Sequence, residues 1–217
     1  MINYSSPDYG QTRNLSRVIS NRTIMEENHL FPVFFKLNRL HVLVVGGGNI
    51  GHEKVNALLE NCPEANITVI ATWFQPELME LVKHAPNVEL IQKPFSCGDM
   101  LGKDLAIAAT SDKELNMYVW EKAKCSRVLI NVADTPELCD FYLGSIVQKG
   151  HLKIAISTNG KSPTVAKRLK EVLQEVIPSS INDVLDKLQV IRERIKGDFT
   201  EKVKELNRIT DVLVRKD

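Results

Sequence analysis

The sequence predicts an α/β protein with a Rossmann-like parallel sheet domain, then a small β-hairpin region and a C-terminal helical domain. Three observations support this fold class. A glycine-rich turn joins an apolar run to a helical pattern within residues 39–54. Strand and helix patterns then alternate as far as residue 132. After that point, two short apolar runs and several charged amphipathic stretches replace the alternation.

The glycine-rich turn is typical of a nucleotide-binding loop. Leu40 and residues 42–45 form a short, β-branched run suited to a strand buried on both faces. The turn fits G-x-G-x-x-G, whose glycines permit a tight turn, the approach of a pyrophosphate, and close packing of the helix on the strand. The following helix start offers amide donors to phosphates, although a tight turn without a ligand is the alternative. The predicted dinucleotide contacts are Gly46, Gly47, Gly48, Asn49, Ile50 and Gly51.

Apolar periodicity places the remaining elements of the first domain. Repeated strand–helix units form a parallel sheet with right-handed crossovers, and their ligands lie beyond the carboxyl ends of the strands. Strands are expected at 66–71, 88–91, 104–110 and 128–132, with helices around 78–82 and over 114–123.

The carboxyl ends of these strands predict one cleft. The turn after the second strand, at residues 71–74, lacks the arginine or lysine that would hold a 2′-phosphate. We therefore expect NAD rather than NADP, with Thr72, Trp73 and Thr110 among its contacts. Asp112 is expected to cap the next helix. The converging segments are Gly46–Gly48, Ala71–Trp73, Thr110–Asp112 and Asn131–Asp134.

The second half of the chain has a different pattern. Residues 141–149 and 152–158 are predicted to pair as a hairpin. Ser162 and Pro163 are suited to cap and begin a helix that ends before Pro178. Amphipathic helices are expected over 181–195 and 199–214. Because this half is too thin to bury its apolar stripes alone, we expect a homodimer.

Composition limits the class of protein. A formal net charge of +1 gives no overall attraction to nucleic acid or to a membrane surface, and the apolar stretches are too short to span a bilayer. We expect a cytoplasmic protein. The four cysteines and five histidines are too scattered to predict a metal site. The expected domains are a flexible tail at 1–29, an NAD-binding domain at 30–143, a dimerisation region at 144–177 and a helical domain at 178–217.

Five motifs occur in the order found in sirohaem synthases: Leu30–Phe34, the GGG turn with Lys54, Ala108–Asp112 with Asn116, Asn131–Asp134, and Ala155–Pro163. On these motifs the chain resembles the precorrin-2 dehydrogenase and sirohydrochlorin ferrochelatase family, from Leu30 to the C-terminus. It departs from the family pattern at Gly51, where alanine is common, at His52-Glu53, and at Gly144, where proline is usual.

The resemblance implies NAD-dependent dehydrogenation of precorrin-2 to sirohydrochlorin, in sirohaem or cobalamin biosynthesis. Asp134 matches the family's catalytic aspartate and is expected to accept a proton in a semi-enclosed cleft, the alternative being a turn aspartate before Pro136. A bifunctional enzyme that also inserts ferrous iron, and a non-catalytic NAD-sensing module, remain as alternatives. The expected substrate contacts, facing a tetrapyrrole with many carboxylates, are Asn116, Thr158, Lys161 and Ser162.

Overall fold

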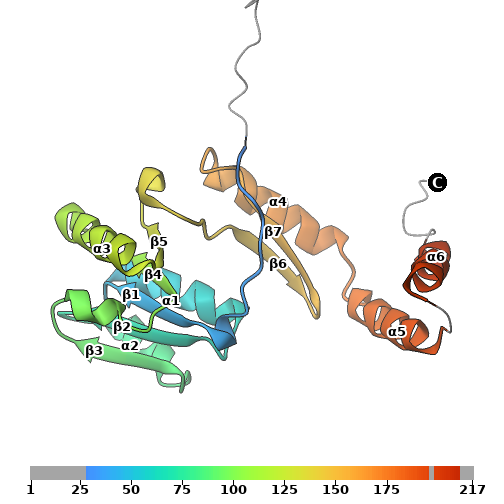
Figure 1. The fold of residues 1–217 in the computed structure, drawn as a ribbon, viewed down its shortest axis with the longest axis horizontal. Coiled ribbons are helices and arrows are strands. Elements are labelled where there is room, and N and C mark those ends of the chain that lie inside the picture. Colours follow the sequence, from blue (N-terminus) through green and yellow to red (C-terminus); the bar gives the residue numbers. More distant parts are fainter. Residues whose placement is uncertain (1–27, 196–197, 211–217) are drawn as a thin grey trace, which may run out of the picture. The chain divides into compact units, whose positions relative to one another are not determined.

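The computed structural model describes residues 28–195 and 198–210 (Figure 1). The chain divides into two units, Met1–Val33 and Phe34–Asp217. Because the described residues begin at 28, the tail predicted at 1–29 lies almost wholly outside them. No helix within the described ranges is long and apolar enough to cross a membrane.

The second unit contains a five-stranded sheet with the strand order β3-β2-β1-β4-β5. All four pairings are parallel, which confirms the predicted fold class. The strands are β1 (His41–Val45), β2 (Asn66–Ala71), β3 (Val88–Gln92), β4 (Leu105–Ala108) and β5 (Leu129–Val132). The helices between them are α1 (Asn49–Asn61), α2 (Pro76–Val82) and α3 (Lys113–Ser126), with short 3-10 turns η2 (Leu37–Arg39), η3 (Cys97–Met100) and η4 (Pro136–Leu138).

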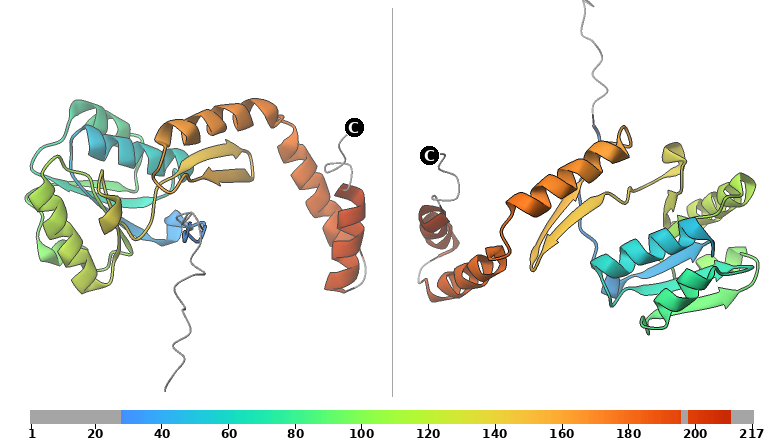
Figure 2. Two further views of the ribbon diagram at one scale, coloured as in Figure 1. Left: turned by 90° about the horizontal axis from the view of Figure 1, so that it is seen from above. Right: turned by 180° about the vertical axis from the view of Figure 1, so that it is seen from behind.

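Two apolar clusters cover the two faces of this sheet. Val42 and Val44 of β1 pack with α1 and α2 on one face. Leu43 and Val45 pack with α3 and η3 on the other, and Figure 2 shows the helices on the two sides. The central strand is thus buried on both faces, as predicted. Each such buried side chain contributes roughly 1.5–3 kcal/mol to stability.

The hairpin consists of β6 (Ser145–Lys149) and β7 (Leu152–Ile156), which pair antiparallel. Helix α4 (Pro163–Val176) contacts both strands, and it is followed by α5 (Ile181–Arg194) and α6 (Phe199–Thr210). The structure confirms the predicted hairpin and the predicted helices after it, although their bounds differ. The part of the last predicted helix beyond residue 210 lies outside the described residues.

Both hairpin strands are shorter than predicted. The first begins at Ser145 instead of residue 141, because the Asn131 amide donates to the Phe141 carbonyl (2.9 Å) and holds that segment along β5. The second ends at Ile156 rather than at residue 158. Asn159 and Gly160 take up left-handed backbone angles (φ 54° and 74°), which turn the chain toward α4.

Candidate functional site

The carboxyl ends of β1, β2, β4 and β5 meet at one edge of the sheet. The residue after β1, β4 or β5 donates its amide to the neighbouring strand, so the four predicted segments lie side by side as expected. The three backbone bonds that join them are Gly46 N–H to Ile70 O (2.9 Å), Ala109 N–H to Val45 O (2.8 Å) and Ala133 N–H to Ala108 O (2.9 Å).

Three of the four glycines in the turn are sterically required. Gly46 has φ +131°, and a Cβ there would lie 2.2 Å from the Ala109 carbonyl oxygen. A Cβ on Gly51 would lie 2.1 Å from the Gly46 carbonyl oxygen, which explains how closely α1 approaches β1. Gly47, outside the three motif positions, has the same constraint, since its Cβ would lie 2.1 Å from the Trp73 carbonyl oxygen.

Gly48 differs from the other three glycines. The nearest atom to a Cβ there belongs to the Trp73 ring, at 3.5 Å, so the chain itself leaves room for a side chain. Gly48 precedes α1, and no side chain in the described part of the chain caps that helix end. The first amides of α1 are therefore available to an anion. An open glycine beside uncapped amides fits the pyrophosphate of a dinucleotide.

The turn after β2 closes one side of this loop. The Gln75 amide donates to the Gly47 carbonyl (2.9 Å), which ties the two segments together. Thr72 and Trp73 are exposed, and Trp73 is 58% accessible. The glycine turn and the indole thus share one surface, where the sequence predicts the adenosine half of the cofactor.

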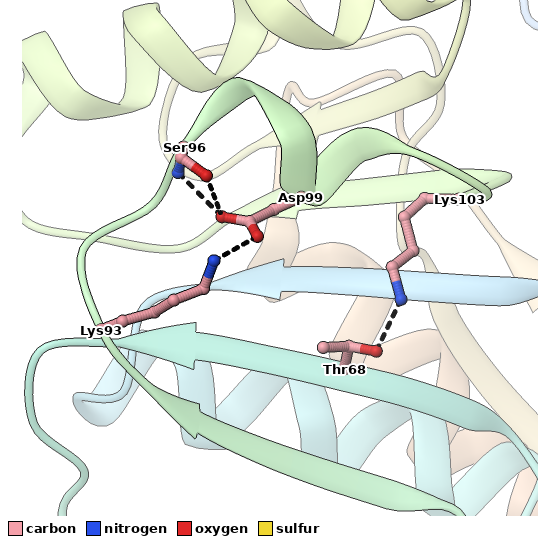
Figure 3. A network of polar contacts seen from close by, with 5 residues as sticks. All are labelled: Thr68, Lys93, Ser96, Asp99 and Lys103. Carbon is pink, nitrogen blue, oxygen red and sulfur yellow. Dashed lines mark hydrogen bonds and ion pairs between the residues drawn. The ribbon is translucent and has the colours of Figure 1, made fainter.

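The structure also brings a cation to the turn after β2. The Lys93 amide donates to the Ala71 carbonyl (2.9 Å), which places this residue beside the end of β2. Its ammonium group pairs with Asp99, and Figure 3 shows Ser96 converging on the same carboxylate. The Asp99 side chain is only 12% exposed. Partial burial raises the pKa of Asp99, but the bonds from Lys93 and Ser96 outweigh it and leave that pKa below its ordinary value.

Asn116 supports the loop after β4. It is buried, and its amide donates to the Thr110 carbonyl (3.0 Å) and accepts from the Thr110 hydroxyl (2.7 Å) and amide (3.2 Å). Its assignment to substrate stays a prediction, because these bonds engage both ends of the amide. Asp112 caps α3 as predicted, accepting from the amides of Glu114 (2.9 Å) and Leu115 (3.1 Å).

Asp134 lies directly beyond β5 in a left-handed conformation (φ 56°). Such angles are uncommon for residues with a Cβ, although aspartate and asparagine tolerate them best. The Thr135 amide bonds to the Val132 carbonyl (3.3 Å) and closes the turn around Asp134. The side chain is exposed in this chain, whereas a semi-enclosed cleft was expected. The Val132–Thr135 turn carries Asp134 beyond the end of β5, where the described residues leave it exposed.

The other predicted substrate contacts belong to the turn between β7 and α4. The Thr158 hydroxyl donates to the Ser162 carbonyl and accepts from the Ser162 amide (both 3.1 Å). Ser162 Oγ accepts from the Val165 amide (3.2 Å), so Ser162 is the predicted cap of α4. Lys161 is exposed in this turn. Their role toward substrate stays a prediction.

Two features of the edge escaped sequence reasoning. The Lys93–Asp99 pair had a local signal, since Ser96 and Asp99 have the spacing of a capping box. Cys139, whose sulfur bonds to both ends of the turn that contains Asp134, had no such signal. All four cysteines are free. Among the described residues, no group of three or more histidine, cysteine or acidic side chains could hold a metal ion.

The parallel sheet, the glycine turn and the open start of α1 define the class of dinucleotide-binding α/β domains. The sequence model of the family described as "Putative NAD(P)-binding" matches residues 33–145, and the chain belongs to that family. A second model, "Sirohaem biosynthesis protein central", matches residues 149–175.

Curated relatives and a solved structure extend this comparison. Siroheme synthase 3 of Aeromonas hydrophila subsp. hydrophila is 35% identical over 168 residues, covering 77% of this chain and 35% of that protein. Siroheme synthase of Pseudoalteromonas translucida is 37% identical with the same coverage. The chain thus spans about a third of the length of these relatives. The structure of "SirC, precorrin-2 dehydrogenase" has a TM-score of 0.67 and 27% identity, covering 83% of this chain and 89% of that one.

Proposed function

We propose that this chain catalyses the NAD-dependent dehydrogenation of precorrin-2 to sirohydrochlorin. The observation that carries the proposal is the placement of Asp134, held in a left-handed turn on the same sheet edge as the glycine loop. Similarity to siroheme synthases over most of the chain, and to a precorrin-2 dehydrogenase of known structure, supports it.

In this proposal the glycine loop binds the pyrophosphate through the first amides of α1, beside the open face of Gly48. Thr72 and Trp73 contact the adenosine end, and Thr110 flanks the Gly46 backbone near the middle of the edge. NAD, when bound there, supplies the hydride acceptor. The oxidation also releases a proton, so the chain must provide a base.

Asp134 is that base. Its carboxylate is exposed at the end of β5, where it can reach a substrate bound across the edge, and it receives the proton when the substrate gives up its hydride. The Thr158–Ser162 turn and Asn116 are proposed to orient the tetrapyrrole.

The left-handed angle of Asp134 allows a clean test of this role. Asparagine tolerates the same backbone conformation but cannot take up the proton, so Asp134→Asn preserves the turn and removes only the base. We expect turnover on precorrin-2 to fall by about 10²- to 10⁴-fold, with the Kd for NAD unchanged. The assay follows sirohydrochlorin absorbance in the presence of NAD.

Glu137→Gln is the matched control, because it neutralises another exposed acid in the adjoining η4 turn. It should keep near-normal turnover. A fully active Asp134→Asn enzyme would mean that Asp134 serves the turn alone, and the base would have to be sought elsewhere.

We propose NAD rather than NADP as the cofactor. The turn after β2 carries no cation of its own, and the one that β3 brings to it, Lys93, is neutralised by Asp99. A 2′-phosphate bound beside the turn after β2 would find the Lys93 ammonium group already paired with the half-buried Asp99 carboxylate. Lys103, on the same face of the sheet as Lys93, donates to the Thr68 hydroxyl (2.7 Å; Figure 3).

We also propose a cytoplasmic homodimer with the domain boundaries 30–143, 144–177 and 178–217. One face of α4 supports the dimer, because apolar side chains repeat along it at helical spacing and are exposed, up to 70% at Val176. A second copy of this chain would cover them. The members of this stripe are Val165, Leu169, Val172 and Val176.

The same assay separates the remaining activities. Ferrous iron added with sirohydrochlorin measures chelation, in which iron is a substrate and sirohaem absorbance is the readout. An NAD-sensing module would bind NAD but leave precorrin-2 unchanged. We favour the dehydrogenase, since a sensor has no need for a carboxylate in the strained turn after β5.

A further inference from the structure

The residues that follow Asp134 return along the outer edge of β5. This strand is the last in the sheet order, so its outer backbone groups have no partner strand among the described residues. Asp140 takes the place of a partner strand here. Its amide donates to the Ile130 carbonyl (2.7 Å), and its carboxylate accepts from the Ile130 amide (3.0 Å). Lys124 of α3 forms an ion pair with the same carboxylate.

One residue earlier, Cys139 continues this pairing with its side chain. The sulfur accepts from the Val132 amide (3.2 Å), and its single S–H can donate to the Thr135 carbonyl (3.4 Å) or to the Val132 carbonyl (3.3 Å). Val132 and Thr135 are the two ends of the turn that contains Asp134. A single thiol therefore ties both ends of this turn to the returning segment.

We propose that Cys139 is a positioning residue, whose thiol fixes the turn that presents Asp134 to the substrate. The proposal rests on the function proposed above. A left-handed aspartate persists only where its surroundings hold it. The bond from the Thr135 amide to the Val132 carbonyl closes the turn from within, and the bonds to the Cys139 sulfur restrain both flanks from outside it.

The thiol suits this role because it can donate and accept at the same time. Burial raises the pKa of Cys139; the Val132 amide opposes this shift, and the charges of Asp140 and Glu137 add to it. The group therefore stays protonated and keeps its donor. Serine offers the same donor and acceptor on a shorter bond, while alanine offers neither.

The test compares Cys139→Ala and Cys139→Ser with Cys125→Ser, a matched control at an exposed cysteine. We expect Cys139→Ala to lower kcat by about 10- to 100-fold, the usual cost of a misplaced catalytic group, with the Kd for NAD unchanged. Cys139→Ser should recover part of this loss. Wild-type kcat in Cys139→Ala would overturn the proposal.

A double variant separates positioning from general structural damage. In the Asp134→Asn background, Cys139→Ala should cost nothing further, because the group it positions is already gone. If Cys139→Ala lowered kcat by the same factor in both backgrounds, Cys139 would act independently of Asp134, and this would also overturn the proposal.

Hydrogen exchange of residues 129–136 provides a readout that does not need activity. Cys139→Ala should accelerate amide exchange at Val132 and in the Asp134 turn, while Cys125→Ser leaves it unchanged. If the wild-type enzyme failed to oxidise precorrin-2, the proposed function would fall while faster exchange still supported the restraint. Unchanged exchange in Cys139→Ala would refute the restraint whatever the activity.

Discussion

Two neighbouring substitutions in the glycine turn should have different effects. One should lower the stability of the fold, and the other should weaken binding of the cofactor. In Gly47→Ala, the new Cβ would lie 2.1 Å from the Trp73 carbonyl oxygen and 2.8 Å from the Phe74 ring. In Gly48→Ala, the nearest described atom beyond the adjoining residues would be in the Trp73 ring, at 3.5 Å, and the extended backbone of Gly48 (φ −87°, ψ −161°) suits alanine.

The magnitudes follow from these distances. Overpacking a tight site costs typically about 1–3 kcal/mol, and a clash with backbone cannot be relieved by rotating a side chain, so we expect about 3 kcal/mol for Gly47→Ala. For a chain of this size this lowers Tm by roughly 6–12 °C. Gly48→Ala should leave Tm within about 2 °C but weaken NAD binding by about tenfold or more, since its methyl group occupies the side where the pyrophosphate approaches.

Thermal unfolding and NAD titration on the same preparations distinguish the two effects. Gly98→Ala is the control, because a Cβ at Gly98 would meet no described atom within 4 Å beyond its chain neighbours and should change neither quantity. The reasoning fails if Gly47→Ala melts like the wild type. It also fails if Gly48→Ala binds NAD at full strength, because the open side of Gly48 would then not face the cofactor.

The remaining predictions concern Asp99 and α4. The lowered pKa of Asp99 makes its contribution to stability complete above the ordinary value of 3.8 and lost as pH falls through the folded value. The difference in urea unfolding free energy between wild type and Asp99→Asn should therefore narrow below about pH 4, and a pH-independent difference would contradict this. Asp99→Asn should also bind NADP several-fold more tightly, a gain that Lys93→Gln cancels in the double variant. Leu169→Glu should convert a dimer to a monomer in light scattering at micromolar concentration, while Lys167→Glu, off the apolar stripe, should not; a dimeric Leu169→Glu protein would place the interface elsewhere.

Several features of this protein follow from local sequence alone. The alternation of strand and helix patterns predicts the parallel sheet because each element buries an apolar face with its own period. Asp112 and Ser162 are recognisable as helix caps, since a cap bonds to amides two or three residues away. Gly46 and Gly51 belong to a motif whose geometry is set by one turn and one helix start.

Other features could be decided only by contacts between distant segments. Gly47 is required because the carbonyl of Trp73, in the turn after the neighbouring strand β2, packs against it, which no local pattern encodes. The first hairpin strand starts late because Asn131 holds Phe141 along β5. The expected semi-enclosed setting of Asp134 required distant segments to pack around its turn, and the described residues leave it exposed.

The sequence by itself determined the fold class, the order of the elements and the segments that meet at the carboxyl edge, because periodicity and turn chemistry act over a few residues. The tertiary structure decided how these segments are held. Lys93 reaches the turn after β2 only through strand pairing, and Cys139 restrains the Asp134 turn only because the chain returns along an unpaired sheet edge. Such contacts depend on which backbone groups the sheet leaves unpaired. These contacts therefore form only once the sheet has assembled.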